Sequence, residues 1–71
     1  MSSSVGRKVK AAAAYRGIQL SKVAELMGMS ASNFTTRLRT GKFTFEELDA
    51  IARILGAEFT GNFTFPNGPE I

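Results

Sequence analysis

Four glycines divide most of this 71-residue chain into segments of helical length. They stand at positions 17, 28, 41 and 56, and glycine often ends an α-helix because it accepts a left-handed backbone. Between them, apolar residues recur at the spacing of a helix with one buried face. We therefore predict four helices in a single domain, over residues 5–16, 20–27, 31–40 and 45–55.

Capping residues mark the starts of two of these helices. Ser30 precedes the third helix, where its side-chain oxygen can accept a hydrogen bond from a free backbone amide. Thr44 followed by Glu47 fits a capping box, in which each side chain serves the other residue's amide. The spacing also predicts the buried faces of two helices, made of Leu20, Val23, Ala24 and Met27 in the second and Phe45, Leu48, Ile51, Ala52 and Leu55 in the fourth.

After Gly56 the pattern changes to alternation. Phe59, Phe63 and Phe65 alternate with polar residues, which predicts a β-strand with one aromatic face over residues 58–65. Such a strand either folds back over its own helices or pairs with the same strand of a second copy. We favour the second arrangement, because a lone strand leaves its backbone groups unpaired. The three phenylalanines are then the expected homodimer interface.

The domain boundaries follow from these elements. Residues 1–4 are expected to be a disordered tail, because short polar termini rarely order themselves. Residues 5–57 form the helical domain, and residues 58–71 form a C-terminal strand and tail that serves as the dimerisation element.

Positive charge is concentrated in the first part of the chain. Residues 1–42 hold eight basic residues and one acid, whereas residues 43–71 hold one basic residue and five acids. The two parts carry +7 and −4, which together give the net charge of +3. A basic half on so small a domain suggests a polyanionic partner, with nucleic acid first.

Composition excludes several other kinds of function. The chain has no cysteine and no histidine, so it has no disulfide, no Cys–His metal site and no Ser–His or Cys–His catalytic pair. We expect no enzyme activity, metal, cofactor or small-molecule ligand. The longest wholly apolar run is Ala11–Tyr15, far short of the ~20 residues that a membrane span needs. With no secretory signal visible, we expect a cytoplasmic protein that does not enter membranes.

The second and third predicted helices are joined by Gly28-Met29-Ser30, which is the sequence form of a helix-turn-helix. Residues 17–30 resemble the first half of a Cro/cI (XRE-type) helix-turn-helix domain, residues 31–41 resemble its recognition helix, and residues 43–56 its following helix. The matched landmarks are Val23, Ala24, Gly28, Ser30, Phe34, Leu55 and Gly56.

This resemblance implies a mainly α fold, a four- to five-helix lambda-repressor-like helix-turn-helix bundle, here with a C-terminal β-strand. It also implies sequence-specific binding of double-stranded DNA by a prokaryotic or phage transcriptional regulator, often as a dimer. Members commonly place a glutamine against phosphate at the start of the second helix. Leu20 stands there in this chain, so Gln19 or Lys22 would have to take over that contact.

A helical wheel of residues 31–40 turns Phe34 and Leu38 inward and most polar residues outward. In the family this helix enters the major groove with its first turn. We therefore assign base reading to Ala31, Ser32, Asn33 and Thr36. Asn33 is the strongest of them, because asparagine pairs bidentately with adenine. Phosphate contacts are assigned to Gln19, Lys22, Thr35, Arg37, Arg39 and Lys42, with Arg7, Lys8 and Lys10 as further candidates.

Two other functions fit the same sequence. A protein–protein module, such as an antitoxin or an anti-regulator, would keep the fold and turn its acidic part to a partner. An RNA-binding protein would use the aromatic strand as a platform on which bases stack.

Overall fold

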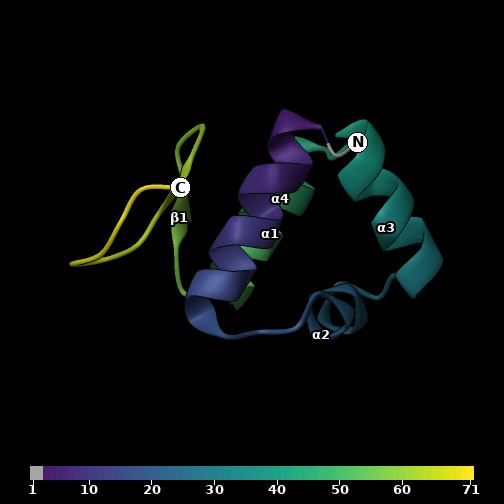
Figure 1. The fold of residues 1–71 in the computed structure, drawn as a ribbon, viewed down its shortest axis with the longest axis horizontal. Coiled ribbons are helices and arrows are strands. Elements are labelled where there is room, and N and C mark those ends of the chain that lie inside the picture. Colours follow the sequence, from purple (N-terminus) through teal and green to yellow (C-terminus); the bar gives the residue numbers. More distant parts are fainter. Residues whose placement is uncertain (1–2) are drawn as a thin grey trace.

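The computed structural model describes residues 3–71, which form four helices and a small C-terminal sheet (Figure 1). The elements are α1 (Ser4–Arg16), α2 (Leu20–Leu26), α3 (Ala31–Thr40), α4 (Phe45–Ile54), β1 (Glu58–Phe59) and β2 (Phe63–Thr64). The predicted mainly helical fold is confirmed. No helix within residues 3–71 is long and apolar enough to cross a membrane.

The first helix begins earlier than predicted. The Ser3 hydroxyl accepts a hydrogen bond from the Gly6 amide at 2.9 Å and donates one to the Leu38 carbonyl at 3.0 Å. Ser3 and Ser4, predicted to belong to a disordered tail, are therefore part of the folded domain, because this hydroxyl joins the start of α1 to the end of α3. Residues 1–2 of that predicted tail lie outside the described residues.

Both predicted helix caps are present. The Ser30 side chain accepts a hydrogen bond from the Asn33 amide at 3.2 Å, and α3 occupies the predicted residues 31–40. Thr44 and Glu47 form the capping box, with the Glu47 amide 3.1 Å from the Thr44 hydroxyl and the Thr44 amide 2.8 Å from the Glu47 carboxylate. These side chains replace the bonds that the first turn of a helix cannot make with its own backbone.

The core takes one face from every helix and two phenylalanines from the C-terminal segment. Its buried members are Val9, Ala12, Ala13, Val23, Ala24, Phe34, Leu38, Leu48, Ile51, Ala52, Leu55, Phe63 and Phe65. Of the residues predicted on buried faces, Leu20 and Met27 are only partly buried at the edge of this core, and Phe45 remains 71% exposed, so its predicted burial is wrong. As the first residue of α4 it lies at the edge of the bundle, where its ring contacts Phe59 with centroids 5.7 Å apart.

The C-terminal segment is a hairpin and not the single strand predicted over residues 58–65. β1 and β2 pair antiparallel, with Glu58 opposite Thr64 and Phe59 opposite Phe63. The chain then turns again, and Ile71 exchanges two backbone hydrogen bonds with Phe63, at 2.6 and 2.8 Å. The backbone groups that a lone strand would leave unpaired are therefore largely satisfied within this chain.

This hairpin buries two of the three predicted dimer-interface residues. Phe63 is fully buried and Phe65 is 4% exposed, whereas Phe59 is half-buried. The prediction that Phe63 and Phe65 present a dimer face is wrong, because a large aromatic side chain gains more by packing on the helices of its own chain than by staying in water. For the same reason they do not form an open platform for stacking RNA bases.

Figure 1 shows the hairpin on one side of α1 and α4, and α3 on the other. Side-chain contacts hold the hairpin there. The Lys8 ammonium donates hydrogen bonds to the Asn62 side chain at 2.6 Å and to the Gly61 carbonyl at 3.3 Å. The Tyr15 ring packs on Phe65 with centroids 4.7 Å apart. The hairpin is thus a support for the bundle, placed away from α3.

Candidate nucleic-acid interface

A tight turn sets α3 against α2. Gly28 has φ +72°, a left-handed backbone that residues with a side chain rarely adopt, and the Met29 amide donates a hydrogen bond to the Ala24 carbonyl at 2.9 Å. Phe34 and Leu38 on the inner face of α3 are buried. With one face packed against the bundle, the opposite face of α3 is free to contact a partner.

All four predicted base-reading residues lie on the accessible part of α3. Ala31, Ser32, Asn33 and Thr36 are exposed and come from its first two turns. The helix therefore brings together small polar and methyl-bearing side chains with no acidic residue among them. Such a surface fits into a major groove without repelling phosphate.

Threonine hydroxyls on this helix are bonded to its own backbone. Thr35 donates to the Ala31 carbonyl at 2.9 Å, Thr36 to the Ser32 carbonyl at 3.0 Å and Thr40 to the Thr36 carbonyl at 3.0 Å. A hydroxyl has one hydrogen, and phosphate oxygens only accept hydrogen bonds. As arranged here, Thr35 has no hydrogen left for the phosphate contact predicted for it.

Arg37 has a structural partner that the sequence analysis missed. Its guanidinium donates to the Glu47 carboxylate at 2.5 Å and to the Lys42 carbonyl at 3.3 Å. These bonds join the last turn of α3 to the first turn of α4. Arg37 therefore helps to fix the orientation of α3 relative to α4, and its predicted phosphate contact competes with this role. A pair ten residues apart follows no helical spacing, so only a three-dimensional structure could show it.

The carboxylate of Glu47 accepts hydrogen bonds from both Arg37 and the Thr44 backbone amide. The hydrogen bond from the Thr44 backbone amide, and then the positive charge and hydrogen bond of Arg37, lower the pKa of Glu47 below its ordinary value, while partial burial opposes the change. The group is therefore ionised at neutral pH and holds the α3–α4 connection by charge-assisted hydrogen bonds.

The other predicted phosphate contacts fall into two groups. Gln19, Lys22, Arg39 and Lys42 are exposed residues at or near the ends of α2 and α3, so they remain candidates for contacts with DNA phosphates. Lys22 lies 3.9 Å from Glu25, which is a weak surface pair. Lys8, in contrast, is bonded to the hairpin on the side away from α3, so it does not belong to this surface. Arg7 is exposed on α1.

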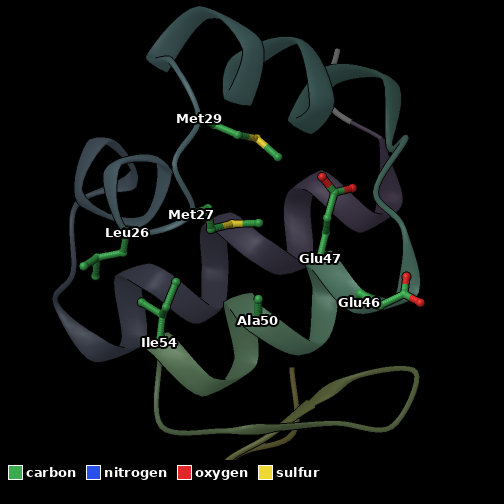
Figure 2. Close-up of a pocket in the computed structure, with 7 residues that line it drawn as sticks. All are labelled: Leu26, Met27, Met29, Glu46, Glu47, Ala50 and Ile54. Atoms are coloured by element: carbon green, nitrogen blue, oxygen red, sulfur yellow. The ribbon is translucent and has the colours of Figure 1, made fainter.

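A second surface feature was not predicted. A hollow of about 310 Å³ lies between the end of α2, the turn and α4. It is lined by Leu26, Met27, Met29, Glu46, Glu47, Ala50 and Ile54 (Figure 2). In Figure 2 the Met27 and Met29 side chains extend across the hollow toward the side where Glu47 lies, Ala50 lies below them on α4, and Glu46 lies at the rim. Leu26 is 56% exposed. As a large apolar residue outside the predicted buried face of α2, it was the one sign in the sequence of an apolar surface here.

These elements define a class of protein, the helix-turn-helix DNA-binding proteins. The family model of the Cro/C1-type HTH DNA-binding domain matches residues 8–60, which is most of the chain. The chain belongs to this family of DNA-binding domains, and the predicted resemblance is confirmed. Comparison with curated proteins and with solved structures gave no match.

Proposed function

We propose that the chain is a sequence-specific double-stranded DNA-binding protein, a transcriptional regulator of prokaryotic or phage type that reads the major groove with α3. The observation that carries this proposal is that the first part of α3 is exposed and has no acidic residue. The burial of Phe34 and Leu38 on the inner face of α3 turns this surface toward solvent. We assign base contacts to Ala31, Ser32, Asn33 and Thr36. The proposal places the protein in the cytoplasm and gives it no catalytic activity.

Phosphate contacts supply affinity in this proposal. Lys22, Arg39 and Lys42 carry the charge and Gln19 adds a hydrogen bond, whereas Arg37 keeps its bond to Glu47. Each neutralised phosphate releases about one counterion. With three cationic contacts per copy, the logarithm of the binding constant should fall with the logarithm of salt concentration with a slope of about −3.

Titration of the full chain into labelled random duplex DNA at several salt concentrations, followed by fluorescence anisotropy, tests the proposal. Arg39→Glu should remove most of the binding. Arg53→Glu is the matched control, because it makes the same charge change on the exposed part of α4. Equal losses in the two variants would show that net charge alone attracts DNA. An absence of salt-sensitive binding in the unmodified chain would contradict the proposal.

We further propose that two copies bind two half-sites about one helical turn apart. Because Phe63 and Phe65 are buried, the contact must use other residues, and the exposed Phe45 ring lying on Phe59 is the best placed. Sedimentation velocity of the full chain should show a dimer that Phe45→Glu converts to a monomer with unchanged helix content. A chain that stays monomeric on a two-site duplex would contradict this arrangement.

A second candidate function is supported by the hollow between α2 and α4. Its apolar floor and acidic rim suit a protein partner with a basic, apolar segment, as expected for an antitoxin or an anti-regulator. The substitution Ala50→Arg separates the two functions. It should leave DNA binding intact if α3 is the functional surface, and it should abolish a protein contact made through the hollow.

A further inference from the structure

The first two turns of α3 present methyl groups and hydrogen-bond acceptors to solvent. Ala31 contributes a methyl group, Asn33 a carboxamide, and Thr36 a methyl group and a hydroxyl. We propose that this face selects A·T base pairs, with adenine amino groups and thymine methyl groups as its contacts. The inference rests on the proposed DNA-binding function and adds the chemistry of the half-site beneath residues 31–36.

The hydroxyl of Thr36 acts as an acceptor toward DNA. Its single hydrogen is donated to the Ser32 carbonyl at 3.0 Å, so the lone pairs that remain can only accept. In the major groove the donors are the exocyclic amino groups of adenine and cytosine, whereas guanine offers the acceptors O6 and N7. As arranged in the structure, Thr36 therefore pairs with adenine or cytosine and not with guanine.

The methyl groups distinguish the A·T pair from the G·C pair. Thymine is the base that carries a methyl group into the major groove, and Ala31 and Thr36 are both exposed residues whose side chains carry a methyl group. The side chain of Asn33 makes no hydrogen bond with another described residue and is free to pair bidentately with adenine. An amino group and a methyl group on one base pair is the pattern of A·T alone.

The same stretch lacks the residues that most often read guanine. Arginine and lysine make the commonest specific contact with guanine, through O6 and N7, and neither occurs in residues 31–36. Arg37 follows directly, but its guanidinium is bonded to Glu47 and to the Lys42 carbonyl. Arg39 lies in the last turn of α3, beyond the part of the helix that enters the groove first.

Selection of binding sites from a random duplex library with the full chain tests this inference. The selected half-site should contain consecutive A·T pairs at its core. Two base analogues then probe single groups in the selected duplex. Uracil in place of thymine removes one methyl group and should weaken binding about fourfold. The base 2-aminopurine in place of adenine removes the major-groove amino group and should weaken binding about tenfold.

Two matched variants assign the contact to Thr36. Thr36→Val and Thr40→Val each remove a hydroxyl that donates to the carbonyl four residues earlier at 3.0 Å, so their effects on the helix are comparable. Thr36→Val should abolish the effect of 2-aminopurine at one adenine, while Thr40→Val should leave every effect in place. Circular dichroism of the two variants checks that both keep their helices.

The outcomes separate this inference from the function on which it rests. A selected core of G·C pairs, or affinity unchanged by both analogues while salt-sensitive binding persists, overturns the A·T reading alone. Loss of the 2-aminopurine effect in Thr40→Val and not in Thr36→Val overturns the role of Thr36. An absence of salt-sensitive duplex binding overturns the proposed function, and the A·T reading with it.

Discussion

At the scale of single residues, a close contact between two helices explains a glycine that helix propensity alone would not favour. Gly6 lies in the first turn of α1, although glycine is a poorer helix former than alanine. A Cβ atom at this position would stand 1.9 Å from the Leu38 carbonyl oxygen. The glycine is needed because the backbone of α3 passes directly against α1 there.

Gly6→Ala should therefore destabilise the domain, although the same change at an exposed helix position would stabilise it. Relief of the clash requires movement of α1 or α3, at a cost of about 1–3 kcal/mol, which exceeds the gain in helix propensity. Urea unfolding followed by circular dichroism measures the difference. Ser4→Ala at an exposed position of the same helix is the control, with an expected change within about 0.5 kcal/mol. A Gly6→Ala variant more stable than the unmodified chain would show that the two helices separate easily.

A second residue-scale prediction concerns pH. The pKa of Glu47 is lowered in the folded chain, chiefly by the Thr44 backbone hydrogen bond and then by Arg37. The contribution of the ionised group is present above the ordinary glutamate pKa of about 4.3 and is lost as pH falls through the lowered folded value. The free energy of unfolding should decline between about pH 5 and pH 3, and less so in Glu47→Gln.

Glu46→Gln is the matched control for that experiment, because its carboxylate makes no hydrogen bond with the described residues. Urea unfolding at each pH gives the free energies. Identical pH dependence in Glu47→Gln and in the unmodified chain would show that the Arg37–Glu47–Thr44 contact does not stabilise the fold.

At the scale of elements, the hairpin completes the core. Four short helices bury small residues such as Ala12, Ala13 and Ala52, which leave room for a large side chain. Phe63 enters from β2 and is fully buried, whereas Phe45 at the start of α4 stays exposed. The sequence pattern predicts a buried or interface position for both phenylalanines, and only their neighbours in space make one buried and the other exposed.

Phe63→Ala should cost about 3–5 kcal/mol, the range for a large buried aromatic side chain. A domain of this size has a total stability of about 4–10 kcal/mol, so the variant should be close to unfolding at room temperature. At a protein concentration low enough to keep the chain monomeric, Phe45→Ala should change stability by less than about 1 kcal/mol. Thermal and urea unfolding of the two variants compare these values, and similar losses in both would mean that the hairpin does not pack as described.

At the scale of the whole molecule, the helical layer separates two surfaces. α3 lies on one side of α1 and α4, and the hairpin lies on the other (Figure 1). Lys8 belongs to the hairpin side through its bond to Asn62, and Arg39 belongs to the α3 side. Two basic residues of the positively charged part of the chain, Lys8 and Arg39, therefore lie on opposite sides of the molecule and serve different purposes.

Lys8→Gln and Arg39→Gln should consequently affect different properties. Each removes one positive charge, but only Arg39→Gln should reduce the salt slope of DNA binding, by about 1. Lys8→Gln should leave that slope unchanged and speed amide exchange in the hairpin, because the bond between α1 and Asn62 is weakened. Equal reductions of the salt slope would place Lys8 at the DNA surface and contradict the separation.

Local signals in the sequence predicted the helices, their caps and the helix-turn-helix, and with them the family and the exposed residues of α3. Glycine stops, capping side chains and the helical period act over a few residues, so they can be read along the chain. Only the tertiary structure decided that the aromatic segment is a buried hairpin, that Ser3 bonds to Leu38, that Arg37 is held by Glu47 and that Lys8 turns away from α3. Each of these depends on segments distant in sequence that meet only when the core forms, because burial and ion pairing are properties of neighbours in space.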